Sequence, residues 1–184
     1  MRAVADARAG LELIRRLGAG SPAARRDAIA DALRRPGEHS PPVLYALANA
    51  LAREPRRGDD AVFWYHVGRL RAVYDALRCR DKAARQSVAA LGRSMSEALR
   101  KRQRDDPVKT LLIAKRAMKW DRSHARSYDL RWVGYHPGLR GKPGAPPQLS
   151  VYDEKDWPDI LRYVHETHLH SVKQFADAAA AEPG

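Results

Sequence analysis

The chain has 184 residues, of which 44% are hydrophobic and 30% are charged, a balance that fits a folded protein and excludes a disordered one. No stretch approaches the roughly 18 to 20 apolar residues of a membrane span, and the charged N-terminal residues do not match a secretory signal. A single cysteine, Cys79, excludes an intrachain disulfide, so we expect a cytoplasmic protein in which this thiol is buried and inert.

Six helices are predicted before residue 120, because alanine, leucine and arginine dominate the composition and glycine and proline cluster at the breaks. The predicted helices cover, to within a few residues, 2–17, 22–35, 41–53, 60–77, 81–103 and 107–119. A side chain that can cap the first turn precedes several of them, and a seventh helix follows over residues 157–181. The expected caps are Ser21, Ser40, Asp59 or Asp60, Asp106 and, for the last helix, Asp156.

The predicted fourth, fifth and sixth helices carry apolar residues at helical spacing, mostly three and four apart, which indicates one buried face on each helix. On the fourth helix the face consists of Phe63, Val67, Leu70, Tyr74 and Leu77. On the fifth it consists of Ala84, Val88, Leu91, Met95 and Leu99, and on the sixth of Val108, Leu111, Leu112 and Met118. We expect these faces to build the core of the domain.

Residues 120–156 form an irregular region that holds four glycines and four prolines. Apolar and polar residues alternate over 128–132 and again over 149–151, a pattern that a small two-stranded ribbon would explain. Long loops within compact domains are uncommon and are often functional. Two interpretations remain open: a partner-binding loop, or a wrapping loop whose Trp132 and Tyr135 pack on the helices.

These elements predict an all-α fold, an irregular bundle of about seven helices whose short connections favour antiparallel pairs. Trp64 and Gly68 match part of the tetratricopeptide-repeat signature, which makes the pairs similar to that repeat, but no second copy of the period follows. We therefore predict a single domain over residues 1–184. It comprises a six-helix body over residues 1–119, the irregular loop over 120–156 and the C-terminal helix.

The histidine, serine and carboxylate groups do not match a catalytic motif. His165 and His168 are three residues apart, whereas a helical zinc-protease motif needs a spacing of four, so we interpret His168 as a hydrogen-bonded core residue. Asp121, Ser123 and His124 are close in sequence but lack the glycine-flanked serine of hydrolases, and no glycine-rich phosphate loop occurs. We therefore predict a protein that is not an enzyme and has no catalytic, cofactor-binding or metal-ligating residues.

The net charge of +12 is concentrated in the middle of the chain. Residues 61–150 carry 20 Lys and Arg against 7 Asp and Glu, whereas residues 151–184 carry 3 against 7. This basic middle could bind an acidic protein, the phosphates of nucleic acid, or the chain's own acidic C-terminal segment. No nucleic-acid-binding motif accompanies the charge, and the aromatic residues are not interleaved with arginine for base stacking. Nucleic acid is therefore the alternative to a protein partner.

The segment Asp60–Asp75, with the sequence DAVFWYHVGRLRAVYD, resembles a segment of small helical bacterial proteins encoded beside secreted antibacterial toxins. In particular it is similar to immunity proteins of type VI secretion systems, and the helix start at Trp157-Pro158 adds to the resemblance. The resemblance implies a cytoplasmic antidote that neutralises a cognate toxin by occluding its active site. It implies no particular site residues.

Charge refines this expectation, because an inhibitor usually meets its target with complementary potential. A basic antidote suits an acidic partner surface, so a hydrolase or transferase with a carboxylate-lined site fits better than a nuclease with a basic active face. We expect the contact surface to include the basic middle and aromatic anchors from the loop. The candidate partner-binding residues are Arg69, Arg71, Arg100, Arg102, Arg104, Lys115, Lys119, Arg122, Trp132, Tyr135 and Arg140.

Overall fold

The computed structural model describes residues 2–135 and 148–181, with side chains for all of these except residues 2–7 and 135. Within this part of the chain there are eight α-helices, three short 3-10 helices and no strand, which confirms the all-α fold class. The α-helices are α1 (Arg2–Leu17), α2 (Pro22–Arg34), α3 (Pro41–Leu51), α4 (Gly58–Arg78), α5 (Ala84–Arg93), α6 (Glu97–Asp105), α7 (Pro107–Ser123) and α8 (Trp157–Ala181). The 3-10 helices are η1 (Pro36–Glu38), η2 (Leu130–Tyr135) and η3 (Glu154–Asp156).

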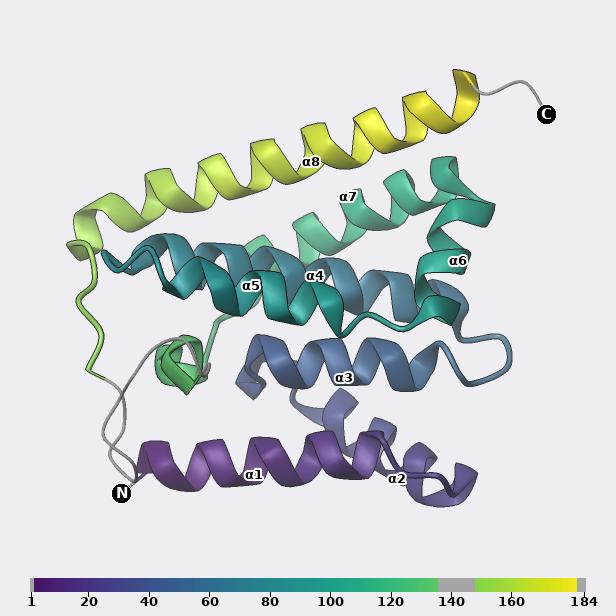
Figure 1. Ribbon diagram of the computed structural model, residues 1–184, viewed down its shortest axis with the longest axis horizontal. Coiled ribbons are helices and arrows are strands. Elements are labelled where there is room, and N and C mark those ends of the chain that lie inside the picture. Colours follow the sequence, from purple (N-terminus) through teal and green to yellow (C-terminus); the bar gives the residue numbers. More distant parts are fainter. Residues whose placement is uncertain (1, 136–147, 182–184) are drawn as a thin grey trace.

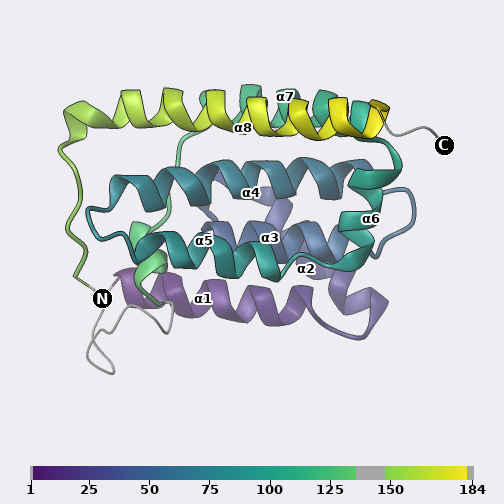
Figure 2. The ribbon, with the colours of Figure 1, turned by 45° about the horizontal axis from the view of Figure 1, so that its top comes forward.

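The helices lie in layers, with α1 and α2 on one side of the molecule and α7 and α8 on the opposite side (Figures 1 and 2). Between them lies α4, which contacts α3, α5, α6, α7 and α8. None of the described helices combines the length and the apolar character that a membrane span requires.

Because α4 is surrounded, the single apolar face predicted for it is too narrow. Thirteen of its 21 residues are buried, and they point in every direction around the helix axis. Polar residues share this burial, among them His66, Arg71 and Asp75. Phe63 and Leu77, at the two ends of the predicted face, are only half-buried.

Local capping chemistry sets two of the predicted helix starts. The Ser21 hydroxyl accepts a hydrogen bond from the backbone N–H of Ala24, and the Asp106 carboxylate accepts one from the N–H of Lys109. The cap predicted at Asp59 or Asp60 is wrong, since α4 begins at Gly58 and both aspartates lie in its first turn. Their carboxylates are engaged in ion pairs instead of capping the helix.

The single helix predicted over residues 81–103 is divided into α5 and α6. Asn49 of α3 holds the break: its amide donates to the carbonyl of Ser94 and its side-chain oxygen accepts from the N–H of Ser96. Ser96 then caps α6 by accepting from the N–H of Leu99. A side chain from another helix therefore satisfies the backbone groups that the break exposes.

The described part of the irregular region contains no two-stranded ribbon. Helix α7 continues to Ser123, and the 3-10 helix η2 replaces the strand expected over 128–132. Val151 does pair with an extended residue, but its partner is Cys79, at the end of α4, in one isolated antiparallel bridge. The segment around Val151, in the last part of the irregular region, is thereby held at the end of α4.

Candidate functional site

Arg71, predicted to contact a partner, is instead a core residue of the α4–α7 interface. Its side chain is 0% exposed, and its Nε donates to Oδ1 of Asp121 at 3.0 Å. Its Nη2 donates to the backbone carbonyls of His124 and Ala125 at 3.3 Å each. Because the guanidinium is fully enclosed, Arg71 fixes the end of α7 and cannot reach a partner protein.

Asp121 is the centre of this buried network. Besides Arg71, it accepts hydrogen bonds from Arg126 and from Nε2 of His165, which lies 2.9 Å away on α8. Burial alone would raise the pKa of Asp121, but the hydrogen bond from His165 and the charges of Arg126 and Arg71 lower it below its ordinary value. His165 in turn accepts at Nδ1 from Nε of Arg122. One ionised carboxylate thus ties α4, α7 and α8 together.

Trp132, predicted as an interface anchor, points into the protein. Its indole N–H donates to Oδ2 of Asp75 at 2.7 Å, while Arg78 donates to Oδ1 of the same carboxylate at 2.6 Å. Burial raises the pKa of Asp75 although Arg78 and Trp132 act in the opposite direction. Next to Trp132, the carbonyl of the fully buried Val133 accepts from the hydroxyl of Ser87. The described residues of η2 therefore wrap the helices.

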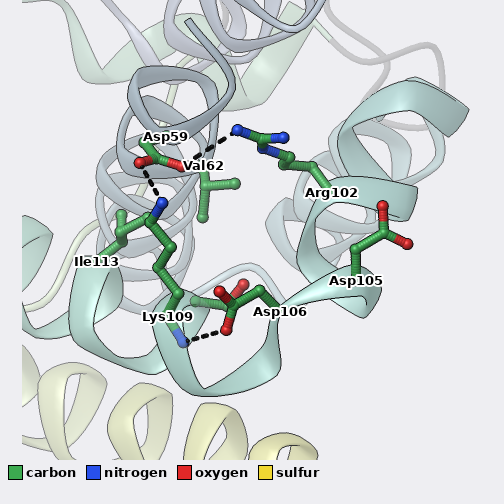
Figure 3. A pocket seen from close by; sticks show the side chains of 8 residues that line it. Asp59, Val62, Arg102, Asp105, Asp106, Lys109 and Ile113 are labelled. Carbon is green, nitrogen blue, oxygen red and sulfur yellow. Dashed lines mark hydrogen bonds and ion pairs between the residues drawn. The ribbon is translucent and has the colours of Figure 1, made fainter. Parts of the chain in front are cut away.

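Two candidate partner residues, Arg102 and Arg104, are exposed but already have acidic partners. Arg104 pairs with Glu97, and Nη2 of Arg102 lies 3.5 Å from Asp59. Asp59 also accepts a hydrogen bond from Nζ of Lys109 at 2.7 Å. Asp59, Arg102 and Lys109 line a small cavity of about 120 Å³ (Figure 3). Asp105 and Asp106 also line the cavity, so neither Arg102 nor Lys109 is an uncompensated cation there.

Helix α7 presents a different exposed surface. Val108, Leu112, Lys115 and Lys119 follow one another at intervals of four, three and four, so they lie on one side of the helix. All four are exposed, with Val108 at 62% and Leu112 at 56%. We call these four residues the α7 outer face. Val108 and Leu112 had been predicted in the core, but Ile113, Ala114 and Ala117 on the opposite side of α7 are buried there.

The two lysines of the α7 outer face have no acidic partner in the part of the chain that the structure describes. Among the described residues, the ion pairs of α7 are made by Lys109 and Asp121, so no carboxylate neutralises Lys115 or Lys119. The acidic C-terminal segment does pack on α4 and α7, but the ion pairs of its described carboxylates are made within the segment itself. These findings argue against neutralisation of the basic middle by the C-terminal carboxylates that the structure describes.

The remaining candidate residues are distributed over three places. Arg122 is exposed beside the α7 outer face and contacts His165. Arg69 and Arg100 are half-buried and line a second cavity, of about 380 Å³, between α4, α6 and α8. The side chain of Tyr135 and the whole of Arg140 lie outside the described residues.

The groups considered for catalysis have structural contacts. Ser123 Oγ lies 3.0 Å from Nδ1 of His124, but both atoms contact the carbonyl of Trp120 and neither contacts Asp121. Cys79 is buried, and burial raises the pKa of its thiol to about 11, which makes the nucleophilic thiolate rare. No group of three or more histidine, cysteine or acidic side chains in the described part of the chain is arranged to hold a metal ion.

Comparisons with protein-family models, with curated proteins and with solved structures find no match to this chain. A functional proposal therefore depends on the residues themselves. Sequence reasoning identified the lysines of the α7 outer face but not their apolar neighbours. A helical wheel of α7 places Ile113, Ala114 and Ala117 on one side, and small and branched apolar residues fill that side completely. Because that side is then the buried one, the wheel indicates that Val108 and Leu112 face outwards.

Proposed function

We propose that this chain is a protein-binding module whose α7 outer face contacts an acidic protein partner. The observation that carries the proposal is the combination of two exposed aliphatic side chains with two lysines that no described carboxylate neutralises. Exposed apolar groups gain free energy when a partner covers them, and uncompensated cations attract a surface of opposite charge.

The composition of this face favours protein over nucleic acid as the partner. Val108 and Leu112 offer aliphatic surface, which packs against apolar side chains but provides no ring for stacking on bases. The aromatic residues Trp64, Trp120 and Trp132 belong to the interior, where they are buried or half-buried. Nucleic-acid binding by the basic helices remains the alternative, and it predicts a strong dependence on salt concentration.

The most specific form of the proposal is an immunity protein that occludes the active site of a bacterial toxin. Its support is the resemblance of residues 60–75 to type VI secretion immunity proteins, together with the positive charge of the exposed middle. Those sixteen residues lie almost entirely in the interior as part of α4, so they would define the shared scaffold. The α7 outer face would then determine which toxin is recognised, and an acidic active-site surface suits it.

The proposal is tested by cross-linking followed by affinity measurement. A photo-reactive amino acid at Leu112 should capture a specific acidic protein in the native cell, and that protein is then purified. We expect the charge reversal Lys115→Glu/Lys119→Glu to weaken its binding at least tenfold, because two attractive interactions become repulsive. The reversal Lys82→Glu/Arg85→Glu, at exposed positions in and before α5, changes the charge equally and should leave the affinity within twofold.

Three results would contradict the proposal. The first is equal affinity of the α7 reversal and wild-type proteins for the captured partner. The second is a captured partner with a strongly basic contact face. The third is exclusive cross-linking to nucleic acid, accompanied by binding to random DNA or RNA that declines steeply with salt, which would establish the alternative.

A further inference from the structure

A cavity of about 380 Å³ lies between α4, α6 and α8, on a different side of the molecule from the α7 outer face. Thr110, the α7 residue in its lining, is buried on the inner side of that helix. This volume falls in the range of small-molecule sites. The lining residues are Tyr65, His66, Arg69, Met95, Arg100, Gln103, Arg104, Thr110, His168, Ser171, Val172 and Phe175.

The charge of this lining is entirely positive, since three arginines and no aspartate or glutamate contribute to it. Arg104 has an acidic partner in Glu97, outside the lining. Arg69 and Arg100 take part in none of the ion pairs found among the described residues of α4 and α6. Arg100 donates to the backbone carbonyls of Met95 and Gly92, contacts that orient the guanidinium without cancelling its charge.

A buried histidine pair adds a polar group that lacks a partner. Nδ1 of His66 lies 3.1 Å from Nε2 of His168, and His66 is only 2% exposed. The remaining ring nitrogen of His66, Nε2, is buried and has no hydrogen-bond partner. When the N–H of His168 donates to Nδ1, the proton of the uncharged His66 ring is on Nε2, which is itself buried, so the histidine pair forms an enclosed part of the cavity wall.

Apolar side chains complete the cavity. Met95, Val172 and Phe175 line it together with the charged groups, and Phe175 is 37% exposed. We propose that this cavity binds a small organic oxyanion, a carboxylate or phosphate group attached to an apolar body. The oxyanion would lie near Arg69 and Arg100, with the apolar body against the Phe175 side. Arginine suits such a group because its planar donors match carboxylate and phosphate oxygens.

Calorimetric titration of the full chain tests the site with defined probes. Phenyl phosphate and benzoate carry both halves of the ligand, whereas inorganic phosphate and phenol carry one half each. We expect saturable binding of at least one of the two complete probes, and at least tenfold weaker binding of the half-probes. Binding should shift the NMR signals of the Arg69 and Arg100 guanidinium N–H groups, because these groups gain a hydrogen-bond acceptor.

Substitutions then locate the two halves of the site. Arg69→Gln should weaken binding of the complete probe at least tenfold, whereas Arg93→Gln, at an exposed arginine outside the lining, should change it less than twofold. Phe175→Ala should weaken the binding of phenyl phosphate but not that of inorganic phosphate. This variant provides a test if Arg69→Gln fails to fold. The proposal is overturned if neither complete probe binds saturably, if either half-probe binds equally well, or if Arg69→Gln retains wild-type affinity.

Discussion

Arg71 and Asp121 show how strongly single residues of this protein depend on their burial. Both side chains are fully enclosed, and Asp121 on α7 accepts from three donors: Arg71 of α4, Arg126 of the segment that follows α7, and His165 of α8. A buried charge is tolerated only when it is paired and hydrogen-bonded, so removing one member leaves the others uncompensated. The network is a structural unit, and its members are poor candidates for partner recognition.

We predict that Asp121→Asn destabilises the protein by about 3 kcal/mol, because it removes the charge that compensates Arg71 and Arg126 in a buried site. Asp177→Asn is a matched control, since Asp177 forms an exposed pair with Lys173 on α8 and its loss should cost less than about 0.5 kcal/mol. Urea denaturation monitored by circular dichroism measures both values. Equal stability of the two variants would show that the network contributes little.

The His66–His168 pair predicts a loss of stability in mild acid. Burial, with a smaller effect of Arg69, lowers the pKa of His168 from 6.5 to about 4, and burial also lowers that of His66. Above pH 6.5 both histidines are uncharged in the folded and in the unfolded chain, and the free energy of unfolding has its full value. That free energy declines as the pH falls towards 4, because the unfolded chain binds protons that the folded chain does not. For His168 alone the loss is about 3 kcal/mol.

The measurement is the free energy of unfolding between pH 7 and pH 4. His168→Gln should flatten its decline, because one of the groups with a lowered pKa is gone, whereas His170→Gln, at an exposed position of α8, should leave the slope unchanged. A wild-type slope in the His168→Gln variant would exclude His168 as the titrating group.

At the scale of the helices, Gly68 controls how closely α3 approaches α4. A Cβ atom built on Gly68 would lie 3.1 Å from a ring carbon of Tyr45 and 3.2 Å from Cβ of Leu44. Both neighbours are buried, so they have little room to move. The small residue is therefore required by packing between helices, which explains a glycine within a helix, where it otherwise costs stability.

The prediction compares two glycine substitutions in helices. Gly68→Ala should destabilise the protein by about 1 kcal/mol, because crowding against Tyr45 and Leu44 outweighs the gain in helix propensity. A Cβ on Gly92 of α5 meets no atom within 4 Å, so Gly92→Ala should be stabilising, by up to about 1 kcal/mol. Thermal unfolding gives the sign of each change. Stabilisation by both substitutions would mean that α3 and α4 can separate without penalty.

For the whole molecule, the central position of α4 predicts that the chain unfolds as one unit. Residues of α4 belong to all three apolar clusters: Trp64 to the first, Leu70 to the second and Ala76 to the third. Loosening any layer therefore exposes apolar surface of the same helix. Such shared burial makes unfolding cooperative.

Single-tryptophan variants test this expectation. Trp120 packs against the first cluster and Trp157 against the second, so variants that retain only one of them report on different layers. Their fluorescence should follow far-UV circular dichroism of the same variant through one transition in urea, with coincident midpoints. Separate transitions for fluorescence and circular dichroism would instead divide the predicted single domain into independently folding parts.

The sequence by itself determined the all-α class and several helix boundaries. Ser21 and Asp106 mark helix starts because capping depends on residues three apart, a local relation that the sequence displays directly. The lysines of the α7 outer face were also predicted, since charge is read from residue type. The aliphatic residues beside them were assigned to the core, because spacing alone does not decide which side of a helix faces its neighbours.

The tertiary structure decided the rest through contacts between residues far apart in the chain. Asn49 divides the predicted fifth helix by bonding to Ser94 and Ser96, some 45 residues away. Asp121, 50 residues from Arg71, converts an arginine predicted on the surface into a core residue. The energy of burying a polar group depends on whether a partner reaches it, and that partner is specified only when the helices pack.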